Sequence, residues 1–472
     1  MTDSKGAGGM KVAIACVADS KTKYLYQSLR LALSLKQLNS MHELTLFVGI
    51  FPGVEDYFVS ALSALGARVS LLPVYSEVHG PSNKMQILRH PDLMEFDYIV
   101  MCDCDIVFVR EFDEIFERQG VQAKIADLKT LPDVTLRSVF TFANRKYPLE
   151  QYRSTLDDLP IIRYCNAGFL AISQNIFSSF VDRWFFWNDQ LLARRDLLKQ
   201  SVFFTDQASL ALVIDEFGDD FIELGVEMNY PIHAPAARYP ESVRSASATV
   251  LHYHDAVNPM TGGLKYCIDG CQNEAVEAIN DRIMTCDQMR RGPVFWDYIY
   301  SEAETRYEDD EFRMDRRGLL SLIMDRCKPK SILDFGCGAD PLIAKLSFQD
   351  YLGVDFSREA VERAKNEVSA GRFMVSDIRQ CVEYKAELVI VLDVLPYVGS
   401  HEEYNAIIER AVAASTDWVL VSGLMSRSDR EGSFATEYYE NVEDTLRRHN
   451  KLNFVKIGSA AGQDFFLGES AS

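Results

Sequence analysis

Two aspartates that could hold a cation directly follow the apolar run Tyr98–Cys102. Asp103 and Asp105 are separated by one residue, and side chains two positions apart on an extended chain point to the same side. Paired carboxylate oxygens at a strand end suit Mg²⁺ or Mn²⁺, and such an ion can bridge them to a diphosphate. The alternative is a pair of solvated or helix-capping acids, because Asp-x-Asp alone is a common pattern.

A second group of residues with a chemical pattern begins at Asp334, where an apolar run leads into Gly336 and Gly338. Glycine lets the chain turn tightly and lets a ligand approach the backbone closely. Asp355 ends the next apolar run, and a carboxylate in that position can accept hydrogen bonds from ribose hydroxyls. The pattern predicts a nucleoside-binding turn, with a solvated strand end as the alternative for Asp355.

The segments that must position Asp103 and Asp105 alternate between strand-like and helix-like patterns. Strands are expected over residues 11–17, 44–50, 69–74 and 98–102, with helices over 25–38 and 57–65. This alternation predicts a mostly parallel sheet with helices on both faces. Ligands of such sheets bind beyond the carboxyl ends of the strands, which is where the two aspartates stand.

The same alternation returns late in the chain and positions Asp334 and Asp355. The elements expected there are a helix over 317–325, strands over 331–334, 351–355, 373–377, 388–392 and 418–422, and a pairing of 453–457 with 464–467. The chain has 472 residues, whereas single cores stop growing near ~250–300 residues. We therefore predict two α/β domains, residues 10–295 and 296–472, with a linker near residue 300 in the acidic stretch 298–315.

Composition and charge exclude several classes of function. The net charge of −20 argues against a nucleic-acid partner, which needs clustered Lys and Arg, although a local basic patch would still permit peripheral membrane contact. No apolar run reaches the ~20 residues of a transmembrane helix, and the polar start 1–9 has no secretory signal, so a cytoplasmic protein is expected. Cys267, Cys271 and Cys286 lack the spacing of a structural zinc site.

The region around the aspartate pair resembles a known segment. A stretch with Lys84 leads into an apolar strand, the Asp pair and another apolar run. This order resembles the DxD segment of GT-A-fold glycosyltransferases, particularly the retaining family 8 group. Further matches follow in the family's order within residues 10–270, namely Asn166-Ala167-Gly168, Thr205-Asp206-Gln207, His252-Tyr253 and Gly263-Leu264-Lys265. The resemblance implies a Rossmann-like domain that binds a nucleotide sugar.

The resemblance also implies roles for single residues. The divalent ion, Mn²⁺ or Mg²⁺, would be bound by Asp103, Asp105 and His252. The donor, a UDP-sugar by resemblance, would contact Lys84, Asp103, Asn166, Gly168 and Lys265. Asp206 and Gln207 would be the catalytic residues beneath the anomeric carbon, and the acceptor would be a glycan or glycolipid.

The sequence departs from the family pattern near the metal-binding histidine. The spacing from His252 to Lys265 is longer than in the family, and no Pro-Trp pair follows Lys265. His254 is a second candidate for the metal. The choice between the two histidines and the role of Lys265 therefore stay open.

The late domain resembles class I S-adenosylmethionine-dependent methyltransferases. The run Asp334-Phe335-Gly336-Cys337-Gly338 resembles their first motif and Asp355 their second, and an acid before the loop suits the cationic methionine end of the cofactor. The implied S-adenosylmethionine ligands are Asp334, Gly336, Gly338, Asp355 and Asp377. Asp393, in a segment like the loop beneath the methyl donor, is the implied catalytic residue, with His401 as another candidate general base.

Both resemblances together imply a bifunctional enzyme that transfers a sugar and methylates a sugar hydroxyl. The alternative is a glycosyltransferase whose late domain binds S-adenosylmethionine without catalysis and regulates the first domain. Turnover of the methyl donor distinguishes the two hypotheses.

Overall fold

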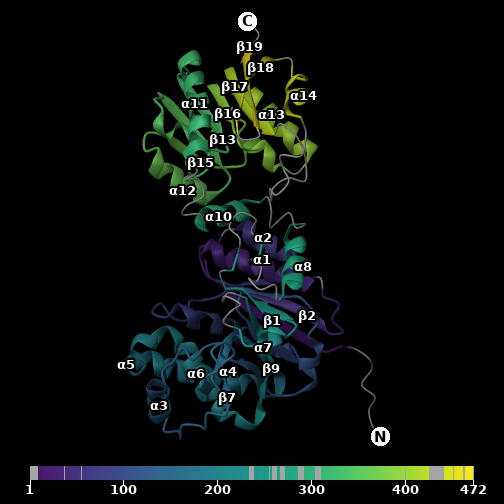
Figure 1. Cartoon of the computed structure of the whole chain (residues 1–472), viewed down its shortest axis with the longest axis vertical. Helices are drawn as coiled ribbons and strands as arrows, with labels where there is room; N and C mark the ends of the chain where they lie inside the picture. Colours follow the sequence, from purple (N-terminus) through teal and green to yellow (C-terminus); the bar gives the residue numbers. More distant parts are fainter. Residues whose placement is uncertain are drawn as a thin grey trace. The chain divides into compact units, whose positions relative to one another are not determined.

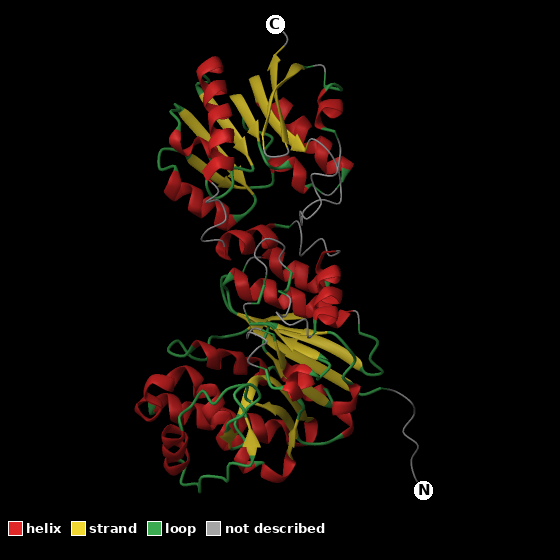
Figure 2. Ribbon diagram, viewed as in Figure 1, coloured by secondary structure: helices red, strands yellow, loops and turns green. Residues whose placement is uncertain are grey.

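A computed structural model of the chain describes most of its residues. They are 9–36, 38–54, 56–232, 239–254, 256–257, 263–265, 272–284, 292–302, 310–398, 400–424, 441–449, 451–460 and 463–470. The chain divides into two compact units, one formed by Met1–Asn258 with Gly263–Thr285 and the other chiefly by Cys286–Ser472. Each unit has its own twisted sheet with helices packed against it (Figures 1 and 2).

The first unit is built on a seven-stranded sheet of order β10-β6-β9-β4-β1-β2-β3. Its strands are β1 (Lys11–Ala18), β2 (Glu43–Ile50), β3 (Arg68–Leu71), β4 (Tyr98–Cys102), β6 (Val121–Ile125), β9 (Cys165–Ser173) and β10 (Phe221–Glu223). All pairings between neighbours are parallel except those that β9 makes with β4 and β6. The predicted mostly parallel sheet is confirmed, and β4 ends at the residue before Asp103.

Helices of the first unit cover this sheet. They are α1 (Thr22–Lys36), α2 (Asp56–Ala64), α3 (Asp133–Phe142), α4 (Gln174–Ala193), α5 (Arg195–Leu198), α6 (Thr205–Glu216), α7 (Glu241–Arg244) and α8 (Asn273–Met284). The residues around Lys84 form a 3-10 helix, η1 (Gly80–Arg89), rather than an α-helix. Trp184 of α4 is fully buried, and its indole N–H bonds to the carbonyl of Asp206 at 3.2 Å. Packing of α4 thus holds the first turn of α6 in place.

A small three-stranded sheet of order β11-β12-β5 stands beside the main one. It consists of β11 (Tyr230–Pro231), β12 (Val250–His252) and β5 (Ile106–Phe108), while β7 (Tyr152–Arg153) pairs separately with β8 (Pro160–Ile161). Strand β12 runs antiparallel to β5, with His252 opposite Ile106. The register therefore sets His252 next to Asp105, although the two residues are far apart in the sequence.

The second unit is built on a seven-stranded sheet of order β15-β14-β13-β16-β17-β19-β18. Its strands are β13 (Ser331–Phe335), β14 (Asp350–Asp355), β15 (Arg372–Val375), β16 (Ala386–Val391), β17 (Ser415–Leu424), β18 (Leu452–Ala460) and β19 (Gln463–Ser470). Pairings are parallel up to β17, whereas β19 is antiparallel to both β17 and β18. From β13 the chain adds β14 and β15 on one side of the sheet, and then β16 and β17 on the other side. The crevice beyond the carboxyl ends of β13 and β16, where the strand order switches, is the expected ligand site.

Helices pack on both faces of the second sheet (Figure 2). They are α10 (Pro293–Glu302), α11 (Asp310–Cys327), α12 (Arg358–Glu367), α13 (His401–Ala414) and α14 (Val442–Leu446). Ile408 of α13 packs in one apolar cluster together with Leu333 and Val389. Ile323 of α11 packs in a second cluster with Leu388. Alternation of side chains along β13 and β16 explains this division into two apolar layers.

Three expectations from the sequence need correction or lie out of reach. The linker is expected near residue 300, whereas the chain divides near residue 285, and Tyr300 is buried within α10 of the second unit. Asp377 lies beyond its strand, since β15 ends at Val375 and the Asp377 carboxylate caps the short 3-10 helix η9 (Ile378–Gln380). The cysteines 267, 271 and 286 and residues 1–8 of the N-terminus lie outside the described residues. The pairing of 453–457 with 464–467 is confirmed.

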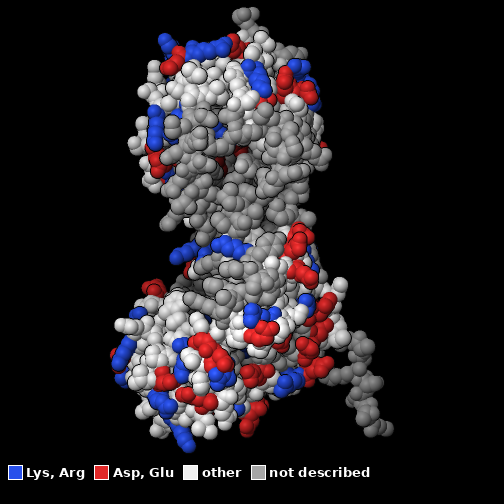
Figure 3. Space-filling model, in the orientation of Figure 1, with Lys and Arg blue, Asp and Glu red and all other residues white. Residues whose placement is uncertain are grey.

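Charged side chains of both signs are interspersed on the face of the first unit that Figure 3 shows, within the described residues. Among those same residues, no helix combines the length and the apolar composition needed to cross a bilayer.

Helix α10 is anchored to α12 by one carboxylate, and this anchor is testable. Asp297 Oδ1 accepts hydrogen bonds from Ser357 Oγ at 2.6 Å and from the N–H of Glu359 at 3.2 Å. Asp297→Ala removes an acceptor from the N-terminus of α12 and should cost about 1 kcal/mol, or roughly 2–4 °C in the calorimetric midpoint. Asp297→Asn, which keeps an acceptor oxygen, is the control. Equal midpoints for Asp297→Ala and the native chain would contradict this role.

Candidate functional sites

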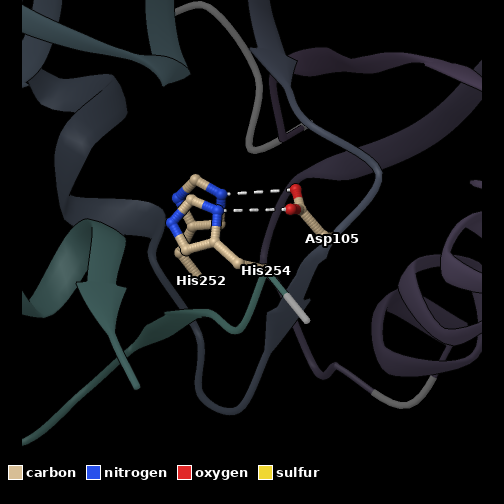
Figure 4. Close-up of side chains that lie close together, drawn as sticks. All are labelled: Asp105, His252 and His254. Atoms are coloured by element: carbon tan, nitrogen blue, oxygen red, sulfur yellow. Dashed lines mark ion pairs between the residues drawn. The ribbon is translucent and has the colours of Figure 1, made fainter. Parts of the chain in front are cut away.

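A carboxylate and two imidazoles meet where β5 begins. His252 Nε2 lies 3.2 Å from Asp105 Oδ1, and His254 Nδ1 lies 3.5 Å from Asp105 Oδ2. Figure 4 shows the two rings side by side, both facing the one carboxylate, and their centroids are 3.8 Å apart. His254 has a φ of 48°, an uncommon backbone conformation for a residue other than glycine. Both histidines that the sequence left as alternatives therefore reach Asp105.

The orientation of His252 is set by a buried amide. Nδ1 of His252 lies 2.9 Å from Oδ1 of Asn229, which is fully buried at the end of the 3-10 helix η6 (Val226–Asn229). Because an amide oxygen only accepts, Nδ1 carries the hydrogen, and Nε2 of the neutral ring directs its lone pair toward Asp105. Two electron-rich atoms 3.2 Å apart require a positive charge between them, either a proton or a cation.

The pKa shifts at this site reflect the same attraction. Burial acts to lower the pKa of His252, but the nearby carboxylate of Asp105 outweighs it and raises that pKa. Burial acts to raise the pKa of Asp105, but His252 and His254 hold it well below its usual range. Asp105 is therefore ionised at neutral pH and attracts a cation.

The donor atoms at Asp105 fit a divalent cation. One atom each from Asp105, His252 and His254 lie within 4.8 Å of one another. His252 Nε2 is buried and makes no well-aligned hydrogen bond to any described residue. A mixed set of carboxylate oxygen and imidazole nitrogen suits Mn²⁺ better than Mg²⁺, which favours oxygen and keeps its water.

Asp103 takes a different partner from Asp105. The chain turns at Cys104 and Asp105 instead of staying extended, so the expected strand alternation does not apply there. Lys84 Nζ lies 3.1 Å from Asp103 Oδ1 and 3.3 Å from Asp206 Oδ2. Burial acts to lower the pKa of Lys84, but the two carboxylates raise it. Lys84 is thus a charged link between the end of β4 and the start of α6.

Gly168 keeps open the space between these groups. A Cβ atom at this position would lie 2.7 Å from His252 Cε1, 2.9 Å from Asn166 Oδ1 and 3.0 Å from Asp103 Oδ2. Asn166 Oδ1 accepts a hydrogen bond from the N–H of Gly168 at 2.7 Å, and its Nδ2 donates to Asp127 Oδ2 at 3.1 Å. Any side chain here would fill the site, which explains why a glycine stands at this position.

Asp206 is buried and Gln207 is partly buried in the first turn of α6. Asp206 is 3 % exposed, and it reaches the site through Lys84. Gln207 Oε1 accepts a hydrogen bond from Tyr164 Oη at 2.7 Å, and that hydroxyl also lies 2.7 Å from Thr130 Oγ1. The first turn of α6 is therefore held from two sides.

Lys265 is tied by its backbone to the segment that follows His254. It is exposed, and its N–H bonds to the carbonyl of Ala256 at 2.8 Å. None of the described contacts that join Lys84, Asp103, Asp105 and Asp206 involves the Lys265 side chain. Its contact with a donor therefore stays a prediction.

The second unit has two adjoining cavities at the carboxyl ends of β13 and β16. The larger, of about 300 Å³, is lined by Asp334, Gly338 and Arg316 among others. The smaller, of about 110 Å³, is lined by Asp355, Asp377 and other residues. The residues that line both cavities are Trp296, Tyr300, Gly336, Asp393 and Tyr397. A bipartite ligand of nucleoside and amino acid would extend through both.

The glycine loop is shaped as the sequence predicts. Gly336 has a φ of 73° and Gly338 one of 64°, and a Cβ at Gly336 would lie 2.3 Å from Val394 Cγ2. Asp355 accepts hydrogen bonds from the N–H groups of Gly338 at 3.0 Å and Ser357 at 2.9 Å. The carboxylate therefore ties β14 to the loop.

The two buried acids beside this loop, Asp334 and Asp355, have pKa values raised toward neutral pH. Burial raises the pKa of Asp334 to about 7, although a hydrogen bond from Tyr351 Oη at 2.8 Å opposes the shift. Burial also raises the pKa of Asp355 to about 6, although the hydrogen bonds from the N–H groups of Ser357 and Gly338 act to lower it. A cationic ligand would favour the ionised form of both acids.

Of the remaining residues expected in the second site, Asp377 and Asp393 line a cavity and His401 does not. Asp377 lines the smaller cavity and is paired with Arg379. Asp393, with a φ of 61°, lines both cavities, and its carboxylate is engaged by Arg316 and Gln463. His401 is exposed at the start of α13, where Nε2 lies 2.8 Å from Asn405 Nδ2, and it lines neither cavity.

Sequence reasoning missed several residues that border these sites. They are Asn229 and Asp127 in the first unit, and Trp296, Tyr300, Arg316, Tyr397 and Gln463 in the second. No motif marks them, since they lie outside the recognised segments. The one usable signal was the aromatic content of α10, whose Trp296 and Tyr300 precede the first strand of the domain.

The folds of the two units are both α/β. The first unit has a mostly parallel sheet, and the second has a glycine loop after its first strand. The Rhodobacterales glycosyltransferase domain family matches residues 14–218, so the first unit contains a glycosyltransferase domain. No curated protein matches the sequence.

Solved structures similar to the chain fall into two groups. N-methyltransferase NodS from Bradyrhizobium japonicum WM9, bound to S-adenosyl-L-homocysteine, is 20% identical, with a TM-score of 0.32 over 36% of this chain and 93% of its own. Magnesium protoporphyrin IX methyltransferase ChlM from Synechocystis PCC 6803 is 19% identical, with a TM-score of 0.31 over 37% and 93%. The galactosyltransferase LgtC, in complex with donor and acceptor sugar analogs, is 14% identical, with a TM-score of 0.37 over 58% and 95%.

The amide that orients His252 offers a test of the cation site. Asn229→Ala removes the acceptor for Nδ1, so the ring loses its fixed tautomer, and Mn²⁺ affinity should fall about 10- to 100-fold. Titration of the full chain with Mn²⁺, followed by the paramagnetic resonance of the free ion, measures this. Asn175→Ala, which alters a side chain paired with Ser173 away from the cluster, is the control. Unchanged affinity in Asn229→Ala would contradict the role of Asn229 in orienting a metal-binding His252.

Proposed function

We propose that the chain is a bifunctional enzyme. Its first unit transfers a sugar from a nucleotide sugar, UDP-linked and with retention of configuration, to a glycan or glycolipid. Its second unit uses S-adenosylmethionine to methylate a sugar hydroxyl. The observation that carries the proposal is the meeting of Asp105, His252 and His254 at the sheet edge, beside the link from Asp103 through Lys84 to Asp206.

The first reaction needs charge stabilisation around the donor. Asp105, His252 and His254 would hold Mn²⁺, which, when bound, supplies positive charge against the departing diphosphate. Lys84 holds Asp103 and Asp206 in fixed positions, and Gly168 leaves room for the sugar between them. The reacting sugar resembles an oxocarbenium ion in the transition state. The buried carboxylate of Asp206 and the adjacent Gln207 are the groups that would stabilise it.

The second reaction depends chiefly on positioning. Asp355 would accept from the ribose hydroxyls in the smaller cavity, and Asp334 would face the methionine end in the larger one. Methyl transfer is an in-line displacement that gains most from holding the acceptor against the methyl group. Asp393, which lines both cavities, is the candidate general base for a hydroxyl acceptor.

One observation favours an alternative for the second unit. Asp393 is paired with Arg316 and hydrogen-bonded by Gln463, so both of its carboxylate oxygens are engaged, although burial raises its pKa. A domain that binds S-adenosylmethionine without catalysis and regulates the first unit is consistent with this. Binding without methyl transfer to any glycan extract would favour regulation, and labelled methyl on glycan would exclude it.

Removal of the acidic pair tests the first activity. Asp105→Ala and Asp103→Ala should each lower hydrolysis of UDP-sugars in Mn²⁺ by at least roughly 100-fold, because the first loses a cation ligand and the second removes one of the two carboxylates that pair with Lys84. Binding of S-adenosylmethionine, measured by calorimetry, should not change. Asp196→Ala, at an exposed acid in the same unit, is the matched control. Full activity in Asp105→Ala would refute the proposed donor site.

The reciprocal change tests the second site. Asp355→Ala removes the acceptor for ribose hydroxyls, and the affinity for S-adenosylmethionine should fall roughly 10- to 100-fold. Hydrolysis of UDP-sugars should stay at the native rate. Asp350→Ala, at the exposed start of the same strand, is the control. If Asp355→Ala also abolished the sugar reaction in a folded chain, the two sites would not be independent.

A further inference from the structure

Three aromatic side chains line the junction of the two cavities in the second unit. Trp296 and Tyr300 come from α10, and Tyr397 ends the 3-10 helix η10 (Leu395–Tyr397). Each of them lines both cavities. A ligand with its nucleoside at Asp355 and its amino acid at Asp334 must pass its central atom through this junction. In S-adenosylmethionine the central atom is the positively charged sulfur.

Trp296 packs against both of the other rings. Trp296 and Tyr397 are 5.0 Å apart between centroids and nearly perpendicular, at 82°. Trp296 and Tyr300 are 5.9 Å apart and tilted by 33°. Tyr300 Oη would lie 3.2 Å from a Cβ atom at Gly338, so the phenol stands over the glycine loop. The aromatic groups therefore border the loop that holds the methyl donor.

The acids near the junction do not account for recognition of a cation there. Asp393 is the carboxylate that lines both cavities, and Arg316 offsets its charge. Asp334 and Asp355 each line one of the two cavities only. Aromatic faces carry negative potential and attract cations within about 6 Å of the ring centre.

We propose that Trp296, Tyr300 and Tyr397 recognise the sulfonium charge of S-adenosylmethionine by cation–π attraction. The proposal rests on the methyl-donor site proposed above. It assigns these residues a role in specificity, because S-adenosylhomocysteine has the same shape apart from one methyl group but a neutral sulfur. The anchor of α10 on α12 through Asp297 holds two of the three rings at the junction.

The test compares the two ligands on the full-length chain by isothermal titration calorimetry. Trp296→Leu and Tyr397→Leu, on separate elements, should each weaken binding of S-adenosylmethionine by about 2- to 30-fold. Binding of S-adenosylhomocysteine should change much less. Trp296→Phe keeps a ring and should keep the native ratio of the two affinities. Phe295→Leu, at a buried ring of the same helix that lines neither cavity, controls for loosening of α10.

The outcomes separate this inference from the proposed function. Equal losses for both ligands, or no loss for either, would overturn the role of the rings while leaving the methyl-donor site intact. A native chain that binds neither ligand would overturn the methyl-donor site itself. If Trp296→Leu does not fold, Tyr397→Leu decides, since Tyr397 lies outside α10. A protonated amine analogue of the sulfonium should follow S-adenosylmethionine in every variant.

Discussion

Buried carboxylates at strand ends are the constraint on which both sites depend. A carboxylate removed from water is costly unless a cation, a hydrogen-bond donor or a proton compensates it. Asp105 is compensated by two imidazoles, and Asp103 by Lys84. Asp355 receives two backbone N–H groups, and Asp334 moves toward its neutral form. Each acid therefore keeps a capacity to attract a positively charged ligand.

In the first unit this compensation is assembled from distant parts of the chain. Lys84 comes from a 3-10 helix, Asp103 from the end of β4 and Asp206 from α6. Antiparallel pairing of β12 with β5 places His252 next to Asp105, and a hydrogen bond to Asn229 orients its ring. Each ion pair of this network, taken alone, contributes little to the stability of the fold. Its members constrain one another's positions, which is the requirement for electrostatic catalysis.

In the second unit the constraint is shape as well as charge. The left-handed conformations of Gly336 and Gly338 open the loop, and Val394 lies where a side chain at Gly336 would stand. Helix α10, which precedes the first strand of the sheet, contributes aromatic rings to the same cavities. Tyr300, which lies in the segment that the sequence marks as a linker, is buried and lines both cavities.

The sequence by itself determined the two α/β folds, strands β1 to β4 of the first unit, the strands of the second unit and the motif residues near strand ends. Local patterns suffice for these, since hydrophobic alternation and glycine loops act over a few neighbouring residues. Only the tertiary structure decided which residues meet. The turn at Cys104 gives Asp103 and Asp105 different partners, and both histidines reach Asp105. These outcomes depend on strand register and on packing between residues far apart in the chain, which no local spacing encodes.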